Sequence, residues 1–292
     1  MPGLCGLRED FPMLAGGLIY MDNAASTLKP ASVIEVMSRF AGSTYANVHR
    51  GVYKEAVRAT REYEEAHRAV ERFLCARPGE IVFTGHGTTG GLHLAALLAL
   101  ANSLIGEGDE IIASMDAHNS NLLTWRSLAR LSRARLRLVP VDGEGVPRWD
   151  LLESMISPRT RIVAVGHVSN VTGYESPVRE IARIAHEAGA MVIVDGAQSV
   201  PHLKVCPREL GADMLAFSPH KMLGPTGIGV LWIRQDLARS LEPPLGGGGT
   251  VEDVSLEGGA VTPVWAEPPL RFEAGTPPHH RGRRSGRRHR VP

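Results

Sequence analysis

The chain has 292 residues, of which 43% are hydrophobic and 22% are charged, and its formal net charge is +1. This is the composition of an ordinary globular protein, long enough for one large domain or two smaller ones. No charged-then-apolar leader opens the sequence, and no apolar run approaches the roughly 20 residues of a membrane helix, so we expect a cytoplasmic protein without membrane partners.

The first clear element is an amphipathic helix predicted over residues 58–74, which follows the polar stretch 43–53. From about residue 80, short β-branched runs alternate with helical patterns, which indicates a mostly parallel sheet covered by helices. Helices are predicted at 88–105 and at 176–189, where Ser-Pro opens the pattern and glycine closes it. Strands are predicted at 80–85, 109–115, 135–141, 161–170, 190–198, 213–218 and 227–234.

The alternation of strands and helices is interrupted after about residue 220. A glycine-rich turn, not a helix, precedes the strand at 227–234, so we expect that strand to be antiparallel or unusually placed. Residues 243–259 are predicted to be a flexible loop, because four consecutive glycines lack backbone order without outside contacts. The glycine run is either a linker or a loop that orders over a ligand or a neighbouring subunit.

The three cysteines, Cys5, Cys75 and Cys206, show no CxxC spacing and have no nearby histidine cluster suited to zinc. We therefore expect neither a disulfide framework nor a metal site. Each cysteine is predicted to be a small buried or semi-exposed hydrophobic residue.

Polar residues follow several predicted strands, and open parallel sheets bind ligands at the carboxyl ends of their strands. After the first strand, Thr88 and Thr89 open a helix, whose N-terminus would hold a phosphate or be merely capped by a threonine. His118 follows the second strand, where it is either structural or a ring that stacks on a flat cofactor. Asn170 follows the fourth strand and Gln198 the fifth.

Two charged residues complete this group. Asp195 ends an apolar strand, where a carboxylate is costly unless paired; it either caps the turn or faces a ring nitrogen. Lys221 is one of only four lysines among 32 basic residues, and is either a surface cation or an amine that forms a Schiff base with a carbonyl. Phosphate cradle, stacking histidine, carboxylate and lysine together indicate pyridoxal 5'-phosphate (PLP).

At this point the residues resemble a known family. The chain is similar to class V aminotransferase-fold enzymes, and most closely to the group II cysteine desulfurases and selenocysteine lyases. The similarity runs from about Phe11 to Pro277 and rests on eight ordered motifs: DNAAST, NVHRGVY, HGTTGG, AHNSNLL, SNVTG, VDGAQSVPH, SPHKMLGPTGIGVL and RFEAGTP.

The resemblance implies a role for each matching residue. Lys221 would bond to the cofactor and then remove the substrate's Cα proton, Asp195 would pair with the pyridine nitrogen, His118 would stack on the ring, and Gln198 would bond the phenolic oxygen. The remaining implied roles are phosphate binding by Thr88, Thr89, Ser218 and His220, phosphate binding across the subunit interface by Thr276, contact with the substrate by Asn170, and lining of the entrance by Ala24 and Ala25.

The resemblance also implies a fold and a reaction. The fold is the large domain of PLP-dependent transferase fold type I, an α/β sheet flanked by helices, at residues 21–277 after an N-terminal segment, 1–20. The reaction releases alanine from L-cysteine and leaves a persulfide on the enzyme, in a homodimer that passes sulfur to an acceptor protein. The alternatives are another class V PLP lyase or aminotransferase, and a non-catalytic PLP-binding remnant.

The sequence departs from the family pattern in three places. Gly90 stands where a glutamate usually follows the two threonines, and we expect a modest effect. The family continues into a small C-terminal domain with a nucleophilic cysteine and a carboxylate-binding arginine, so the chain is expected to be truncated and impaired. The basic tail at 278–292 is interpreted as frame-shifted or disordered sequence; the competing nucleic-acid arm is disfavoured because the tail lacks lysine and aromatic residues.

Overall fold

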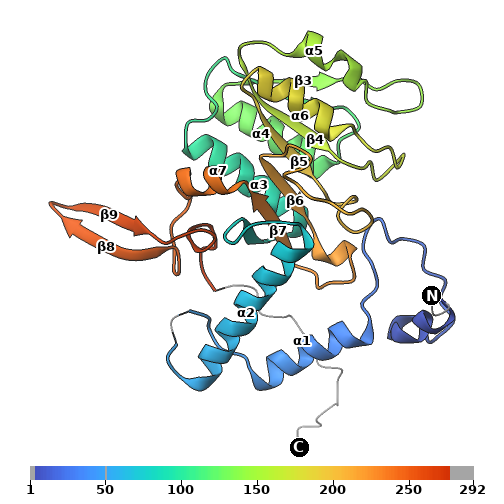
Figure 1. Ribbon diagram of the computed structural model, residues 1–292, viewed down its shortest axis with the longest axis vertical. Helices are drawn as coiled ribbons and strands as arrows, with labels where there is room; N and C mark the ends of the chain where they lie inside the picture. The colour runs from blue at the N-terminus through green and yellow to red at the C-terminus, as the bar shows by residue number, and fades with distance from the viewer. Residues whose placement is uncertain (1–3, 50, 277–292) are drawn as a thin grey trace, which may run out of the picture.

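A seven-stranded sheet forms the centre of the computed structural model, which describes residues 4–49 and 51–276 (Figure 1). The strands lie in the order β1-β7-β6-β5-β4-β2-β3. Strand β7 is antiparallel to both of its neighbours, and the other adjacent pairs are parallel. The bounds are β1 (Ile81–Gly85), β2 (Glu110–Ser114), β3 (Arg135–Val139), β4 (Thr160–Gly166), β5 (Met191–Asp195), β6 (Met214–Phe217) and β7 (Ile228–Ile233).

All seven predicted strands are therefore present, and the mostly parallel α/β fold and the antiparallel last strand are confirmed. The basic tail at 278–292 lies outside the described residues. Within the described residues, no helix combines the length and apolar character needed to cross a membrane.

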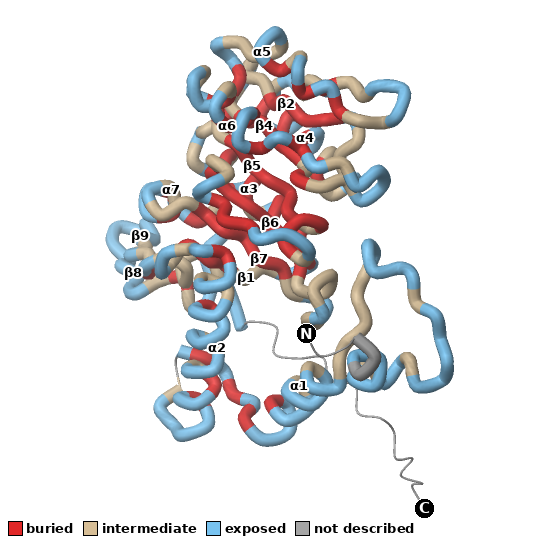
Figure 2. Tube along the Cα trace, turned by 45° about the vertical axis from the view of Figure 1, so that its right-hand side comes forward, coloured by how far each residue is buried: buried red, intermediate tan, exposed pale blue. Residues whose placement is uncertain are grey.

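Both faces of the sheet are covered by helices. Successive residues of a strand point to opposite faces, so strands that are apolar throughout present an apolar surface on each side. In β5, for example, Val192 belongs to one buried cluster and Ile193 to the other. One face packs against α3 (Gly87–Ala101), α4 (Asn119–Ser132) and α7 (Gln235–Ser240), and the other against α5 (Leu152–Met155) and α6 (Val178–Glu187). Figure 2 shows the buried residues concentrated along the sheet and α3.

The N-terminal part lies mostly away from the sheet (Figure 1). Its elements are the 3-10 turns Leu4–Asp10 and Pro12–Leu14 and the helices α1 (Ala31–Ser43) and α2 (Lys54–Phe73). The predicted helix at 58–74 is thus α2, which begins four residues earlier than its amphipathic pattern indicated. A small separate core, which includes Phe40 and Ala56, joins α1 to α2.

Part of the predicted flexible loop is wrong, because residues 251–257 form a strand. The strands β8 (Val251–Glu257) and β9 (Ala260–Trp265) pair antiparallel in a hairpin that projects from the body of the protein (Figure 1). Gly258 and Gly259 both have positive φ, as a two-residue hairpin turn requires. The glycine run also has contacts within its own chain, since Gly275 N–H donates to the carbonyl of Gly248 at 2.8 Å.

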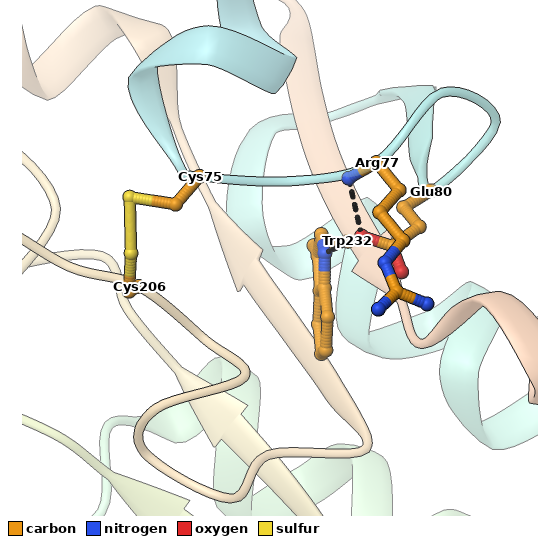
Figure 3. The surroundings of a disulfide bond; sticks show 5 residues. All are labelled: Cys75, Arg77, Glu80, Cys206 and Trp232. Atoms are coloured by element: carbon orange, nitrogen blue, oxygen red, sulfur yellow. Dashed lines mark hydrogen bonds between the residues drawn. A yellow bond between two sulfur atoms is a disulfide. The ribbon is translucent and has the colours of Figure 1, made fainter.

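The expectation that the cysteines are unpaired is wrong for two of them. Cys75 and Cys206 form a disulfide that joins the end of α2 to the connection between β5 and β6, with 5.4 Å between their Cα atoms (Figure 3). The two cysteines are 131 residues apart in sequence, so no local spacing could indicate the pairing.

A buried glutamate lies close to this disulfide (Figure 3). The Glu80 carboxylate accepts hydrogen bonds from the backbone N–H of Arg77 at 2.8 Å and from Trp232 Nε1 at 2.9 Å. It also pairs with the guanidinium of Arg208 at 2.5 Å. Because Arg208 is two residues from Cys206, charge and disulfide connect the same two segments.

A second buried carboxylate joins the segment after β9 to α2. Glu273 accepts hydrogen bonds from Tyr63 Oη and from the backbone N–H of Phe83, both at 2.6 Å, and pairs with His67 Nε2 at 2.9 Å. Burial lowers the pKa of His67, but the hydrogen bond and charge of Glu273 outweigh this, and the net pKa is raised. The pair therefore includes a charged imidazole at mildly acidic pH.

We predict that reduction of the disulfide, or Cys75→Ser, lowers the free energy of unfolding by roughly 2–5 kcal/mol, because the bond closes a long loop in the unfolded chain. Chemical denaturation with and without reductant measures this. The control, Cys5→Ser, should keep the sensitivity to reductant. Titration of all three thiols in the unreduced native protein would contradict the prediction.

We also predict that the contribution of His67 to stability falls as pH rises. A group whose pKa is raised in the folded state stabilises it fully below its unfolded pKa, about 6.5 for histidine, and loses this effect above the raised value. The difference in unfolding free energy between the wild type and His67→Gln should therefore be larger at about pH 5.5 than at about pH 8.5. The charge of Glu71 also raises the pKa of His67, and the charge of His67 in turn contributes to the lowered pKa of His49.

The matched control for this comparison is His93→Gln, since His93 is exposed on α3. Its unfolding free energy should follow that of the wild type at each pH. If His67→Gln changes the unfolding free energy equally at the two pH values, Glu273 does not raise the pKa of His67.

Candidate functional site

A cavity of about 490 Å³ lies where β1, β2, β4, β5 and β6 end. Since these strands run in the same direction, their following loops meet at one edge of the sheet. The cavity brings together eleven of the residues proposed from the sequence: Ala24, Ala25, Thr88, Thr89, His118, Asn170, Asp195, Gln198, Ser218, His220 and Lys221.

Hydroxyl groups gather around the N-terminus of α3. The backbone N–H of Thr88 donates to Ser218 Oγ at 2.5 Å, and the two hydroxyls lie 2.7 Å apart. Thr89 Oγ1 lies 2.7 Å from Ser120 Oγ on α4. The residue that precedes the helix is His86, so the interpretation of a threonine as a simple N-cap is wrong.

Two glycines in this turn allow a close approach that no other residue would. A Cβ atom on Gly87 would lie 2.6 Å from Ser218 Oγ, and the residue has a φ of +64°. A Cβ atom on Gly90 would lie 1.7 Å from the carbonyl oxygen of Gly85. A residue with a Cβ atom at position 90 would therefore require this turn to shift.

Two charged groups of the cavity, Lys221 and Asp195, influence each other. Burial lowers the pKa of Lys221, while the charge of Asp195 opposes that shift. Burial also raises the pKa of Asp195, opposed by the backbone N–H of Ala197 and by the charges of His118 and Lys221. The cavity thus holds an amine that loses its proton more easily than usual, and a buried carboxylate that favours a cationic neighbour.

Three further polar candidates, His118, Gln198 and Asn170, border the same cavity. His118 precedes α4, and its Nδ1 accepts the backbone N–H of Ser120 at 3.1 Å, so it caps the helix while its ring stays exposed. The Gln198 amide donates to the carbonyl of Ala24 at 2.7 Å. Asn170 is exposed in the loop after β4.

Sequence reasoning missed several residues of the cavity wall. Asp22 lies in the DNAAST stretch and His86 in HGTTGG, both quoted as motifs but not considered singly. Asp116 lies two residues after the end of β2, so its position near a strand end was the available signal. Ser120 became apparent only through its contact with Thr89, which connects two helices.

Thr276 does not lie with the other candidates. It borders two other cavities, together with Tyr63 of α2 and Glu273, and one of them is also lined by His86 and residues of α3. Within one chain, therefore, the structure does not bring Thr276 to the cavity that contains Lys221.

Comparisons with known proteins agree with this geometry. The chain is 55% identical over 272 residues to a probable cysteine desulfurase of Aeropyrum pernix, covering 93% of this chain and 66% of that protein. An apo structure of the cysteine desulfurase of Thermococcus onnurineus superimposes with a TM-score of 0.87 at 42% identity, covering 96% of this chain and 68% of that one. SspA in complex with cysteine matches with a TM-score of 0.75 at 29% identity, covering 90% and 69%.

The chain therefore spans about two thirds of the length of these relatives. The family model for aminotransferase class-V matches residues 19–281, which include the sheet, the cavity and Glu273. The chain belongs to the aminotransferase class-V family and is a homologue of the cysteine desulfurases.

Proposed function

We propose that residues 21–277 form a PLP-binding large domain that takes part in a cysteine desulfurase reaction on L-cysteine. The observation that supports this most is the common cavity of Lys221, Asp195 and the N-terminus of α3. An amine of lowered pKa, a buried carboxylate and a helix N-terminus are the groups that a phosphorylated pyridine aldehyde requires.

The residues present fit this cofactor. Asp195 is only 7% exposed, and burial raises its pKa. A protonated ring nitrogen beside it would stabilise the buried carboxylate. The hydroxyls of Thr88 and Ser218 and the imidazole of His220 border the cavity near the start of α3, where a phosphate would be stabilised.

When bound, PLP supplies an electrophilic carbonyl for an amine and a ring that accepts electrons from Cα. Asp195 would hold the ring nitrogen protonated, and His118 would orient the ring. The Nζ atom of Lys221 would remove the substrate's Cα proton, because a lysine of lowered pKa is a competent base near neutral pH. Asn170 would orient the substrate carboxylate.

The choice of L-cysteine follows from the relatives, which include a probable cysteine desulfurase, a cysteine desulfurase of solved structure and SspA in complex with cysteine. Removal of its sulfur leaves alanine and places the sulfur on a thiol as a persulfide. We propose the same reaction here, in a homodimer in which Thr276 of each subunit serves the other subunit's phosphate, with an acceptor protein for the sulfur.

The disulfide favours a second candidate reaction. Cys75 and Cys206 are bonded to each other, and neither borders the cavity, so neither offers a thiolate to the substrate sulfur. A substrate such as cysteine sulfinate loses its sulfur group without a thiol. The same site would then release alanine from cysteine sulfinate by elimination alone.

We predict that the protein incubated with PLP gains visible absorbance, and that borohydride fixes the cofactor on Lys221, as peptide mass spectrometry would show. Lys221→Ala should abolish both signals, because no other amine borders the cavity among the described residues. The control Lys204→Ala, at an exposed position, should retain them.

Alanine release from L-cysteine and from cysteine sulfinate then separates the two reactions. Release from both substrates supports the desulfurase proposal, and release from cysteine sulfinate alone supports the second candidate. Attachment of the cofactor to a lysine other than Lys221 would refute the proposed site.

A further prediction concerns the turn that would hold the phosphate. Alanine is favoured over glycine within helices by up to about 1 kcal/mol, but Gly90→Ala should destabilise by about 1–3 kcal/mol because its Cβ meets the Gly85 carbonyl. PLP should also bind more weakly, since the turn positions Thr88. Gly42→Ala in α1, where nothing lies within 4 Å, is the matched control and should be neutral or stabilising.

Thermal melting and PLP titration of the two variants measure these effects. If Gly90→Ala and Gly42→Ala behave alike, glycine is not required at position 90. The variant Gly90→Glu, which introduces the residue common in relatives, should be at least as destabilised as Gly90→Ala.

A further inference from the structure

A second lysine lies beside the turn that contains Lys221. Lys29 donates from Nζ to the carbonyl oxygens of Thr27 at 2.5 Å and of His220 at 3.0 Å. It is half-buried, and burial lowers its pKa. Lysine is rare in this chain, with only four in 292 residues, yet two of the four lie at this one turn.

The His220 carbonyl is unusually well supplied with donors. Besides Lys29 Nζ, it is approached by the backbone N–H and the hydroxyl of Thr27, both at 3.0 Å, and by Ser26 Oγ at 3.3 Å. A carbonyl oxygen has two lone pairs, so these donors compete for it. The ammonium is the one cationic donor among them, and hydrogen bonds from charged groups are roughly twice as strong as neutral ones.

This carbonyl belongs to the peptide that joins His220 to Lys221, and the N–H of the same peptide lies 3.3 Å from the carbonyl of Ser218. Both ends of the peptide are therefore held. The plane of this peptide sets the direction in which the Cα–Cβ bond of Lys221 leaves the backbone. A group that fixes the carbonyl thus also limits where the Lys221 amine can lie.

Thr27 closes the other end of the turn. Its hydroxyl donates to the His220 carbonyl and accepts the backbone N–H of Leu223 at 2.7 Å. Leu223 has a φ of +67°, a conformation that costs energy for a residue other than glycine. The N-terminal segment 26–29 therefore holds a strained turn closed over residues 220–223.

We propose that Lys29 is a positioning residue: its ammonium holds the carbonyl of His220 and thereby orients Lys221. The importance of that orientation rests on the proposed function, in which Lys221 bonds the cofactor. Without Lys29 the turn opens toward water, and the Lys221 amine loses the desolvation that makes it easy to deprotonate.

The test is competitive labelling of the cofactor-free protein with trace acetic anhydride, with the rate at each lysine read by mass spectrometry across a range of pH. The small number of lysines makes each site separately readable. In the wild type, Lys221 should be labelled with a lower pH midpoint than exposed Lys54 and Lys204. In Lys29→Met the Lys221 midpoint should rise, and its labelling near neutral pH should fall up to about tenfold, as a rise of about one pKa unit would produce.

Two further variants separate positioning from folding. Lys29→Arg keeps the charge and should restore most of the Lys221 labelling. Thr27→Val removes the hydroxyl bond to the same carbonyl and should change Lys221 in the same direction as Lys29→Met; it carries the test if Lys29→Met fails to fold. In each variant, an unchanged circular dichroism spectrum and thermal melting curve report an intact fold.

The control is Lys204→Met, which removes an exposed lysine outside the turn. If Lys221 in Lys29→Met has the same midpoint and rate as in Lys204→Met, the proposal is overturned and Lys29 is only a structural tie. PLP attachment is measured in parallel. If Lys29→Met changes the labelling of Lys221 but PLP does not attach to the wild type, Lys29 positions Lys221 and the proposed function is refuted. If PLP attaches but the labelling of Lys221 is unchanged, the proposed function stands and the role of Lys29 is refuted.

Discussion

The position of β7 is the constraint on which the site depends. This strand comes last in the main sheet, yet it lies between β1 and β6 and pairs antiparallel with both. It thereby aligns β1 parallel to β6, so the start of α3 and the turn that contains Lys221 lie at the same edge. Gly229 in β7 permits this, because a Cβ atom there would lie 2.1 Å from the Gly87 carbonyl.

The cavity also depends on a segment remote in sequence from the sheet. Residues 22–29 precede the first helix, but they contact the Lys221 turn through Thr27 and Lys29 and contact Gln198 through the carbonyl of Ala24. These contacts span more than 170 residues of chain, and they supply one wall of the cavity. The site therefore forms only where the N-terminal segment packs against the loops that follow β5 and β6.

The opposite end of the sheet is held by a different set of contacts. The disulfide and Glu80 tie the end of α2 to the β5–β6 connection, and Glu273 ties the segment after the hairpin to α2 and β1. Each buried carboxylate is satisfied by several donors, which offsets the cost of its burial. None of these tying residues borders the cavity that contains Lys221.

Strand alternation and polar residues at strand ends are local signals, and from them the sequence predicted the seven strands, the antiparallel last strand and seven of the residues that border the cavity. The other four, Ala24, Ala25, Ser218 and His220, were indicated by the resemblance to a known family. The sequence also identified Lys221 through the rarity of lysine. The Cys75–Cys206 bond and the contact of Lys29 with His220 became apparent only in the tertiary structure. These depend on which distant segments meet, and that is settled by the packing of the whole chain around β7 and not by any pattern within one segment.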